Sequence, residues 1–161
     1  MFEEFDEKNK NLADEVKTNE EEHKFENVPD GTYEVKIDDM SLTMSKKNQP
    51  MLMVKFKILP KQKYAGRYIF MYKLCNTAPL INMVRGFLSS LTPKGDNHIS
   101  IGYTTMTQLE EDIDALFTGI DGAYEYQLDV FTNDKGFTNY KITDIFAAEQ
   151  PTVEESLPFE S

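Results

Sequence analysis

Basic and aromatic side chains are interspersed in one stretch of the chain, residues 40–95. This stretch contains no aspartate or glutamate, although the protein of 161 residues has a formal net charge of −11 at pH 7. The combination suits a single-stranded nucleic acid, because cations neutralise phosphates while aromatic rings stack on unpaired bases. The alternative is that the rings belong to the core and the lysines to a solvated strand face. The candidate nucleic-acid-binding residues are Lys46, Lys47, Lys55, Lys57, Lys61, Lys63, Tyr64, Arg67, Tyr68, Phe70, Tyr72 and Lys73.

The negative charge is concentrated at the two ends of the chain. Residues 1–27 carry 10 acidic and 4 basic groups, and residues 147–161 carry 4 acidic groups and no basic group. The middle section, 28–146, is close to neutral and has the length of a single domain with one core. We therefore expect an acidic flexible arm over 1–27, a barrel domain over 28–146 and an acidic disordered tail over 147–161.

Alternating apolar residues predict five strands that would position these side chains. The first strand follows a turn at residues 28–31, and two successive polar residues, Asp38 and Asp39, interrupt its alternation and predict a β-bulge. The third to fifth strands are expected over 67–74, 123–131 and 137–146, the last two joined by a hairpin turn. The second strand is predicted to place one apolar set on one face and Met53, Lys55 and Lys57 on the other; the apolar set is Leu52, Val54, Phe56 and Ile58.

The third strand is apolar on both faces, so its periodicity leaves its orientation open. If Ile69 and Met71 lie in the core, three rings remain beside Lys55 and Lys57 as a stacking platform. We expect about half of the candidate aromatic residues to be core. The three rings of the platform would be Tyr68, Phe70 and Tyr72.

Two helices are predicted between the third and fourth strands. The first begins at residues 76–79 and continues to Leu91, and the second begins at Thr107, whose spacing to Glu110 matches a capping box. These elements predict a mainly β protein: a five-stranded, oligonucleotide-binding (OB) type Greek-key barrel with one or two helices and disordered acidic tails. In that fold the face around the second and third strands is the ligand surface.

Three motifs within the predicted domain occur in a recognisable order: VPDGTYEV at 28–35, SKKNQPML at 45–52 and YAGR at 64–67. Their order resembles a family of bacteriophage single-stranded DNA-binding proteins that have an acidic C-terminal tail. The similarity covers roughly residues 28–91. It implies an OB barrel that binds single-stranded DNA without sequence preference, and a role in phage DNA replication or recombination.

The C-terminal tail is similar to the acidic segment, ending in Pro-Phe, with which bacterial single-stranded DNA-binding proteins recruit replication and repair enzymes. Glu160 and Ser161 follow the phenylalanine here, so the terminal carboxylate of the bacterial motif does not adjoin the ring. The resemblance implies a tail that binds replication or recombination proteins, and the alternative is a solvated tail. The matching residues are Glu154, Glu155, Leu157, Pro158 and Phe159.

The sequence contains no group of residues with the spacing of a catalytic or metal site. His23 and His98 are far apart in the sequence, and Cys75 has no neighbouring ligand type at a metal-site spacing. The chain also lacks a phosphate-loop motif and a nucleophile elbow. We expect no enzyme activity, no cofactor and no metal. With neither a signal peptide nor an apolar stretch of about 20 residues, we also expect no membrane association and a cytoplasmic location, in the host cell if phage-encoded.

A different class of function is compatible with the same charge pattern. A phage regulatory or inhibitor protein would use its acidic surface for protein–protein contacts, and its strand lysines would then be dispensable. RNA is a narrower variant of the first hypothesis, because stacking and phosphate contacts do not read the 2′-hydroxyl. The sequence leaves the oligomeric state open, a homo-oligomer included.

Overall fold

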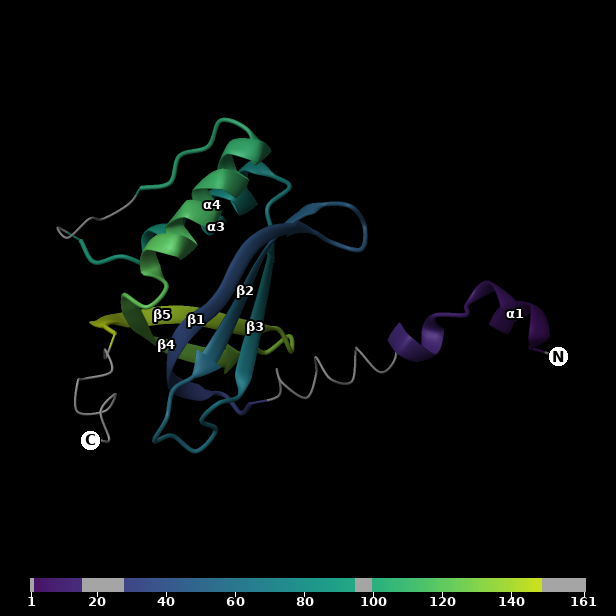
Figure 1. Ribbon diagram of the computed structural model, residues 1–161, viewed down its shortest axis with the longest axis horizontal. Helices are drawn as coiled ribbons and strands as arrows, with labels where there is room; N and C mark the ends of the chain where they lie inside the picture. The colour runs from purple at the N-terminus through teal and green to yellow at the C-terminus, as the bar shows by residue number, and fades with distance from the viewer. Residues whose placement is uncertain (1, 16–27, 95–99, 149–161) are drawn as a thin grey trace, which may run out of the picture.

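The computed structural model describes residues 2–15, 28–94 and 100–148. The predicted tail contacts at residues 154–159 lie outside this description. The helices and strands (Figure 1) are α1 (Glu3–Lys8), β1 (Gly31–Met44), β2 (Pro50–Ile58), β3 (Tyr68–Leu74), α3 (Ala78–Ser89), α4 (Met106–Ile120), β4 (Tyr124–Thr132) and β5 (Thr138–Ala147).

The five strands form one antiparallel sheet in the order β3-β2-β1-β4-β5. β1 belongs to both halves of this sheet, because residues 31–35 pair with β4 and residues 35–44 pair with β2. In Figure 1, β1, β2 and β3 stand upright, and β4 and β5 cross below α3 and α4. The expectation of a mainly β fold with five strands is confirmed. The sheet is open, since no ladder joins β3 to β5 within the described residues, and its form is consistent with a barrel-like fold.

The predicted β-bulge lies in the middle of β1. The register with β2 shifts between Ile37 and Asp39, so Asp38 is the additional residue. Both Ile37 and Met40 are buried, which strict alternation would not permit because they are three positions apart. The bulge therefore returns the second half of β1 to the core and increases its bend.

One hydrophobic core lies between the inner face of the sheet and the two long helices. Leu52, Val54, Phe56 and Ile58 of β2 are all buried, as the alternation of this strand predicts. From the helices, Val84 and Leu88 of α3 and four apolar residues of α4 complete it. α4 packs against β1 and α3 packs against β3. Both helices lie on the core side of the sheet, opposite the outer face of β2 and β3.

Both helices begin at threonine N-caps. The Thr77 hydroxyl accepts a hydrogen bond from the Leu80 N–H of α3, within the predicted start. For α4 the predicted start is two residues late, because Thr105 is the N-cap and accepts from the Gln108 N–H at 3.0 Å. The helix ends at Ile120. The Thr-x-x-Glu spacing favours Thr107, whereas Thr105 has Gln108 three positions later. The Gln108 Oε1 accepts a hydrogen bond from the Thr104 N–H at 3.0 Å, just before the N-cap.

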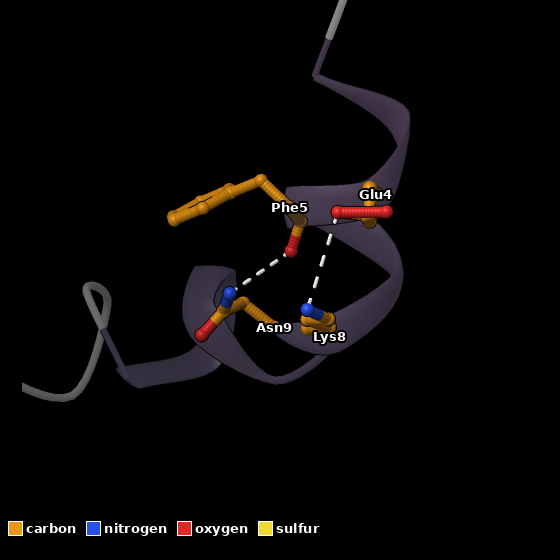
Figure 2. Close-up of polar contacts among 4 residues, drawn as sticks. All are labelled: Glu4, Phe5, Lys8 and Asn9. Atoms are coloured by element: carbon orange, nitrogen blue, oxygen red, sulfur yellow. Dashed lines mark hydrogen bonds and ion pairs between the residues drawn. The ribbon is translucent and has the colours of Figure 1, made fainter.

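α1 is a short helix with no buried residue. Its turn is closed by a hydrogen bond from the Asn9 Nδ2 to the Phe5 carbonyl at 2.9 Å and by a Lys8 Nζ to Glu4 Oε1 ion pair at 4.0 Å (Figure 2). Exposed pairs of this kind contribute about 0–1 kcal/mol. The helix therefore adds little to the stability of the sheet domain.

Candidate nucleic-acid interface

The β2–β3 ladder settles which side of β3 faces outward. Phe56 pairs with Ile69 and Val54 with Met71, and all four side chains are buried. The intervening positions must then lie on the outer face, because successive side chains of a strand alternate. The outer cross-strand pairs are Lys57 with Tyr68, Lys55 with Phe70, and Met53 with Tyr72. We call these six residues the outer β2–β3 face.

Lysines and rings touch one another on this face. The Lys55 Nζ lies 4.2 Å from the ring centroid of Tyr68 and 6.0 Å from that of Phe70, and the Lys57 Nζ lies 5.9 Å from that of Tyr68. Such cation–π contacts hold the ammonium groups beside the rings. The face therefore offers positive charge and aromatic surface within the reach of one nucleotide.

Phe70 and Tyr72 present parallel ring surfaces. Their centroids are 6.2 Å apart and their planes differ by 6°. This separation reflects alternate positions on one strand, which repeat at roughly 6.6 Å. Tyr72 is 42% exposed, so its ring is accessible. The arrangement suits bases that stack successively along β3.

Two charged residues of β1, Lys36 and Asp38, adjoin the face although they lie outside the basic stretch 40–95. The bulge residue Asp38 forms an ion pair with Lys55, with Oδ2 and Nζ 3.5 Å apart. Lys36 lies directly opposite Lys57 across the β1–β2 ladder. Like charges in such positions repel, and a bound anion would relieve the repulsion. Both residues lie before residue 40, so only the strand pairing could reveal them.

The β2–β3 loop, residues 59–67, carries four further candidates. The Gln62 amide fixes the loop to β1, since it accepts from the Glu34 N–H at 2.9 Å and donates to the Glu34 carbonyl at 2.8 Å. Tyr64 packs edge-on against Tyr33, at 6.3 Å between ring centroids. The cations near Tyr64 are Lys63, with Nζ 5.5 Å from the ring centroid, and Arg67, with Cζ at 5.4 Å; Lys61 is exposed.

The β1–β2 loop presents Lys46 and Lys47 to solvent at the other end of β2. Ser45 shapes this turn, because its hydroxyl accepts hydrogen bonds from the Lys47 and Gln49 N–H groups at 3.3 and 3.2 Å. The loop and the outer β2–β3 face thus contribute lysines in series along β2.

The structure does not bring all candidates together. Lys73 shares the alternation of Ile69 and Met71, so it extends from the opposite side of β3 to Tyr72. Among the four candidate aromatic residues, only Tyr64 packs against the core, and it does so in part. The expectation that half of them are core is therefore wrong, because the inner positions of β3 are filled by Ile69 and Met71 instead.

Other sites of chemistry are scarce in the described residues. No group of three or more histidines, cysteines or carboxylates is placed to hold a metal ion in residues 2–15, 28–94 and 100–148. Cys75 is buried, and burial raises the pKa of its thiol, which keeps it protonated and unreactive. Within the same residues no helix combines the length and apolar character that crossing a membrane requires.

Comparison with known proteins gives a partial match. A family model described as a protein of unknown function (DUF669) matches residues 14–81. The match spans β1, β2 and β3 and therefore the whole outer β2–β3 face, while its description assigns no activity. No curated protein matches the chain.

Proposed function

We propose that the protein binds single-stranded DNA across the outer β2–β3 face, largely without sequence preference. The observation that supports this most strongly is the row of three rings on the outer side of β3, with the core filled from the other side of the strands. Tyr68 and Phe70 lie beside Lys55, and Tyr72 lies parallel to Phe70. Each stacked base contributes about 1–3 kcal/mol, and each phosphate contact releases counterions.

The two loops extend this surface at both ends of β2. Lys46 and Lys47 would contact phosphates beyond Tyr72, and Lys61, Lys63 and Arg67 would do so beyond Tyr68. Lys36 and Lys57 are cross-strand neighbours, and this pairing of like charges favours a phosphate between them. It therefore also supports the proposed DNA path. Lys73 has no part in the proposed path.

The biological role that we propose is phage DNA replication or recombination. The motifs that resemble phage single-stranded DNA-binding proteins, at 28–35, 45–52 and 64–67, all lie within the stretch that the DUF669 model matches. In this proposal the C-terminal residues Glu154, Glu155, Leu157, Pro158 and Phe159 recruit a replication or recombination protein. No residue is assigned a catalytic role.

The direct test is fluorescence anisotropy of a labelled dT oligonucleotide with the wild type and a Lys55→Glu/Lys57→Glu variant. We expect the variant to bind at least about tenfold more weakly, because it replaces two phosphate contacts with repulsion. A Lys94→Glu/Lys141→Glu variant is the matched control, since it makes the same charge change at exposed positions outside the face. Equal losses in the two variants, or no binding by the wild type, would contradict the proposal and favour the protein-interaction alternative.

A further inference from the structure

A cavity of about 520 Å³ lies where the outer β2–β3 face meets the β2–β3 loop and β4. Its walls include the apolar side chains Leu59, Pro60 and Ala65, the ammonium-bearing Lys36 and Lys57, and the carboxylate of Glu125. A pocket with mostly apolar walls and a few converging polar groups is typical of small-molecule recognition. Its size and chemistry suit a single nucleotide.

The lysines of this cavity belong to adjacent strands. Lys36 and Lys57 are directly opposite in the β1–β2 ladder, which places their Cβ atoms about 4.5–5.5 Å apart. Lys57 also contacts the Tyr68 ring, the first ring of the proposed DNA path. A nucleotide that follows the base stacked on Tyr68 would therefore place its phosphate between the two ammonium groups.

Glu125 limits the cavity on the β4 side. It is half-buried, and it also lines a neighbouring cavity together with Glu34. A carboxylate is an acceptor only, so it favours a base that presents an amino group. Thymine carries its O4 carbonyl where cytosine carries an amino group, and a carbonyl and a carboxylate in that position form no hydrogen bond with each other. Cytosine, by contrast, presents its N4 amino group, the usual partner of a glutamate.

We propose that this cavity holds one nucleotide of the bound strand and that Glu125 gives it a preference for a base with an exocyclic amino group over thymine. The inference rests on the proposed function and adds one selective position to a path that is otherwise insensitive to sequence. Lys36 and Lys57 bind the phosphate, the apolar loop residues enclose the base, and Glu125 accepts its amino hydrogen.

The test compares dC and dT oligonucleotides of equal length by fluorescence anisotropy at mildly alkaline pH. The wild type is expected to bind dC at least about fivefold more tightly than dT, the lower range for one well-placed base contact. In Glu125→Gln this ratio is expected to approach one, because the amide can also donate to thymine carbonyls. Lys36→Ala should weaken both oligonucleotides by a similar factor, since phosphate contacts carry no base information.

The ratio of the two affinities separates base recognition from electrostatics. Removal of any nearby negative charge raises both affinities equally, so Glu34→Gln, the control in the neighbouring cavity, should leave the ratio unchanged. Equal wild-type binding of dC and dT, or an unchanged ratio in Glu125→Gln, would overturn the nucleotide pocket and leave the proposed function standing. Absence of binding to either oligonucleotide would overturn the proposed function itself.

Discussion

Lys55 lies between an aromatic ring and a carboxylate. Its Nζ is 4.2 Å from the Tyr68 ring centroid and 3.5 Å from the Asp38 Oδ2, and both members of the ion pair are about one-third exposed. The bulge in β1 supplies this carboxylate. In the proposed function Asp38 would therefore compete with a phosphate for Lys55, and this competition would limit the affinity of the face for DNA.

We predict that Asp38→Asn increases the affinity for single-stranded DNA about two- to fivefold. A partly exposed ion pair is worth up to about 1 kcal/mol, and the substitution makes Lys55 available without a large change in shape. The measurement is anisotropy of a dT oligonucleotide, with urea unfolding to show that the bulge remains stable. Asp134→Asn, which removes an exposed carboxylate in the β4–β5 turn, is the control. Equal affinities of the two variants would contradict competition at Lys55.

Single residues of the site were predictable where the chain alternates clearly. Lys55 and Lys57 lie between buried apolar positions of β2, and the alternation places them outward. Lys36 and Asp38 could not be assigned to the site in the same way, because they lie on a different strand and their proximity depends on the β1–β2 register. Glu125 is more distant still in sequence and reaches the cavity through β4.

At the level of elements, β3 shows the limit of pattern reading. Both of its faces are apolar, so its hydrophobic period does not say which residues are core. The register with β2 decides the matter by pairing Ile69 with Phe56 and Met71 with Val54. By contrast, the bulge in β1 was predictable, because two polar residues in succession cannot both avoid the core in a regular strand.

Helix boundaries were less accurately predicted than helix positions. α3 begins where Thr77 and Pro79 indicate, whereas α4 begins at the Thr105 cap. Two threonines near the start of α4 each have a partner residue three positions later that could complete a cap. The sequence favours Thr107 only because Glu110 lies three positions later. In the structure the Gln108 N–H donates to the Thr105 hydroxyl, so Thr105 is the N-cap.

Tyr126 joins β4 to the segment that follows α3. Its hydroxyl donates a hydrogen bond to the Leu91 carbonyl at 2.8 Å, and the side chain is fully buried. Burial, with a smaller contribution from nearby Tyr124, raises the pKa of Tyr126 well above the ordinary value of 10.0. The folded protein therefore favours the neutral phenol.

We predict that Tyr126→Phe lowers the free energy of unfolding by about 1–3 kcal/mol, because the Leu91 carbonyl loses its buried partner. The wild type should also lose stability as the pH rises above about 10, since the unfolded tyrosine ionises there while the folded one does not. This loss should be smaller in the variant. Urea unfolding at neutral pH and above pH 10 measures both effects. Equal pH dependence of the two proteins would contradict the assignment to Tyr126.

On the scale of the whole molecule, the fold places basic and acidic side chains on different parts of the sheet, which the net charge alone does not show. The net charge is −11, yet the outer face of β2 and β3 carries lysines. The adjoining outer positions of β1 and β4 carry Glu34, Glu125 and Asp129. Phosphates would be repelled from these carboxylates, so the proposed DNA path follows β2, β3 and their loops. It reaches β1 and β4 only at the cavity lined by Lys36, Lys57 and Glu125, where the two lysines would hold the phosphate.

The mainly β class followed from the period of the apolar residues, and the position of the basic stretch on β2 and β3 followed from its sequence range. The combined surface did not, because it depends on which strands are neighbours. β1 pairs with both β2 and β4, and this shared pairing brings Asp38 and Glu125 to the border of the basic region. Long-range neighbours of this kind leave no local pattern in the chain.

The most direct test of the account is a salt titration of binding to a dT oligonucleotide and to a duplex of equal length. If about four phosphates are neutralised, log K for the single strand should fall with log salt at a slope near −3, from about −0.7 per phosphate. The Lys55→Glu/Lys57→Glu variant should show a slope shallower by at least about 1, and the duplex should bind more weakly at every salt concentration. Binding that is insensitive to salt, or duplex affinity equal to that of the single strand, would contradict the proposed interface.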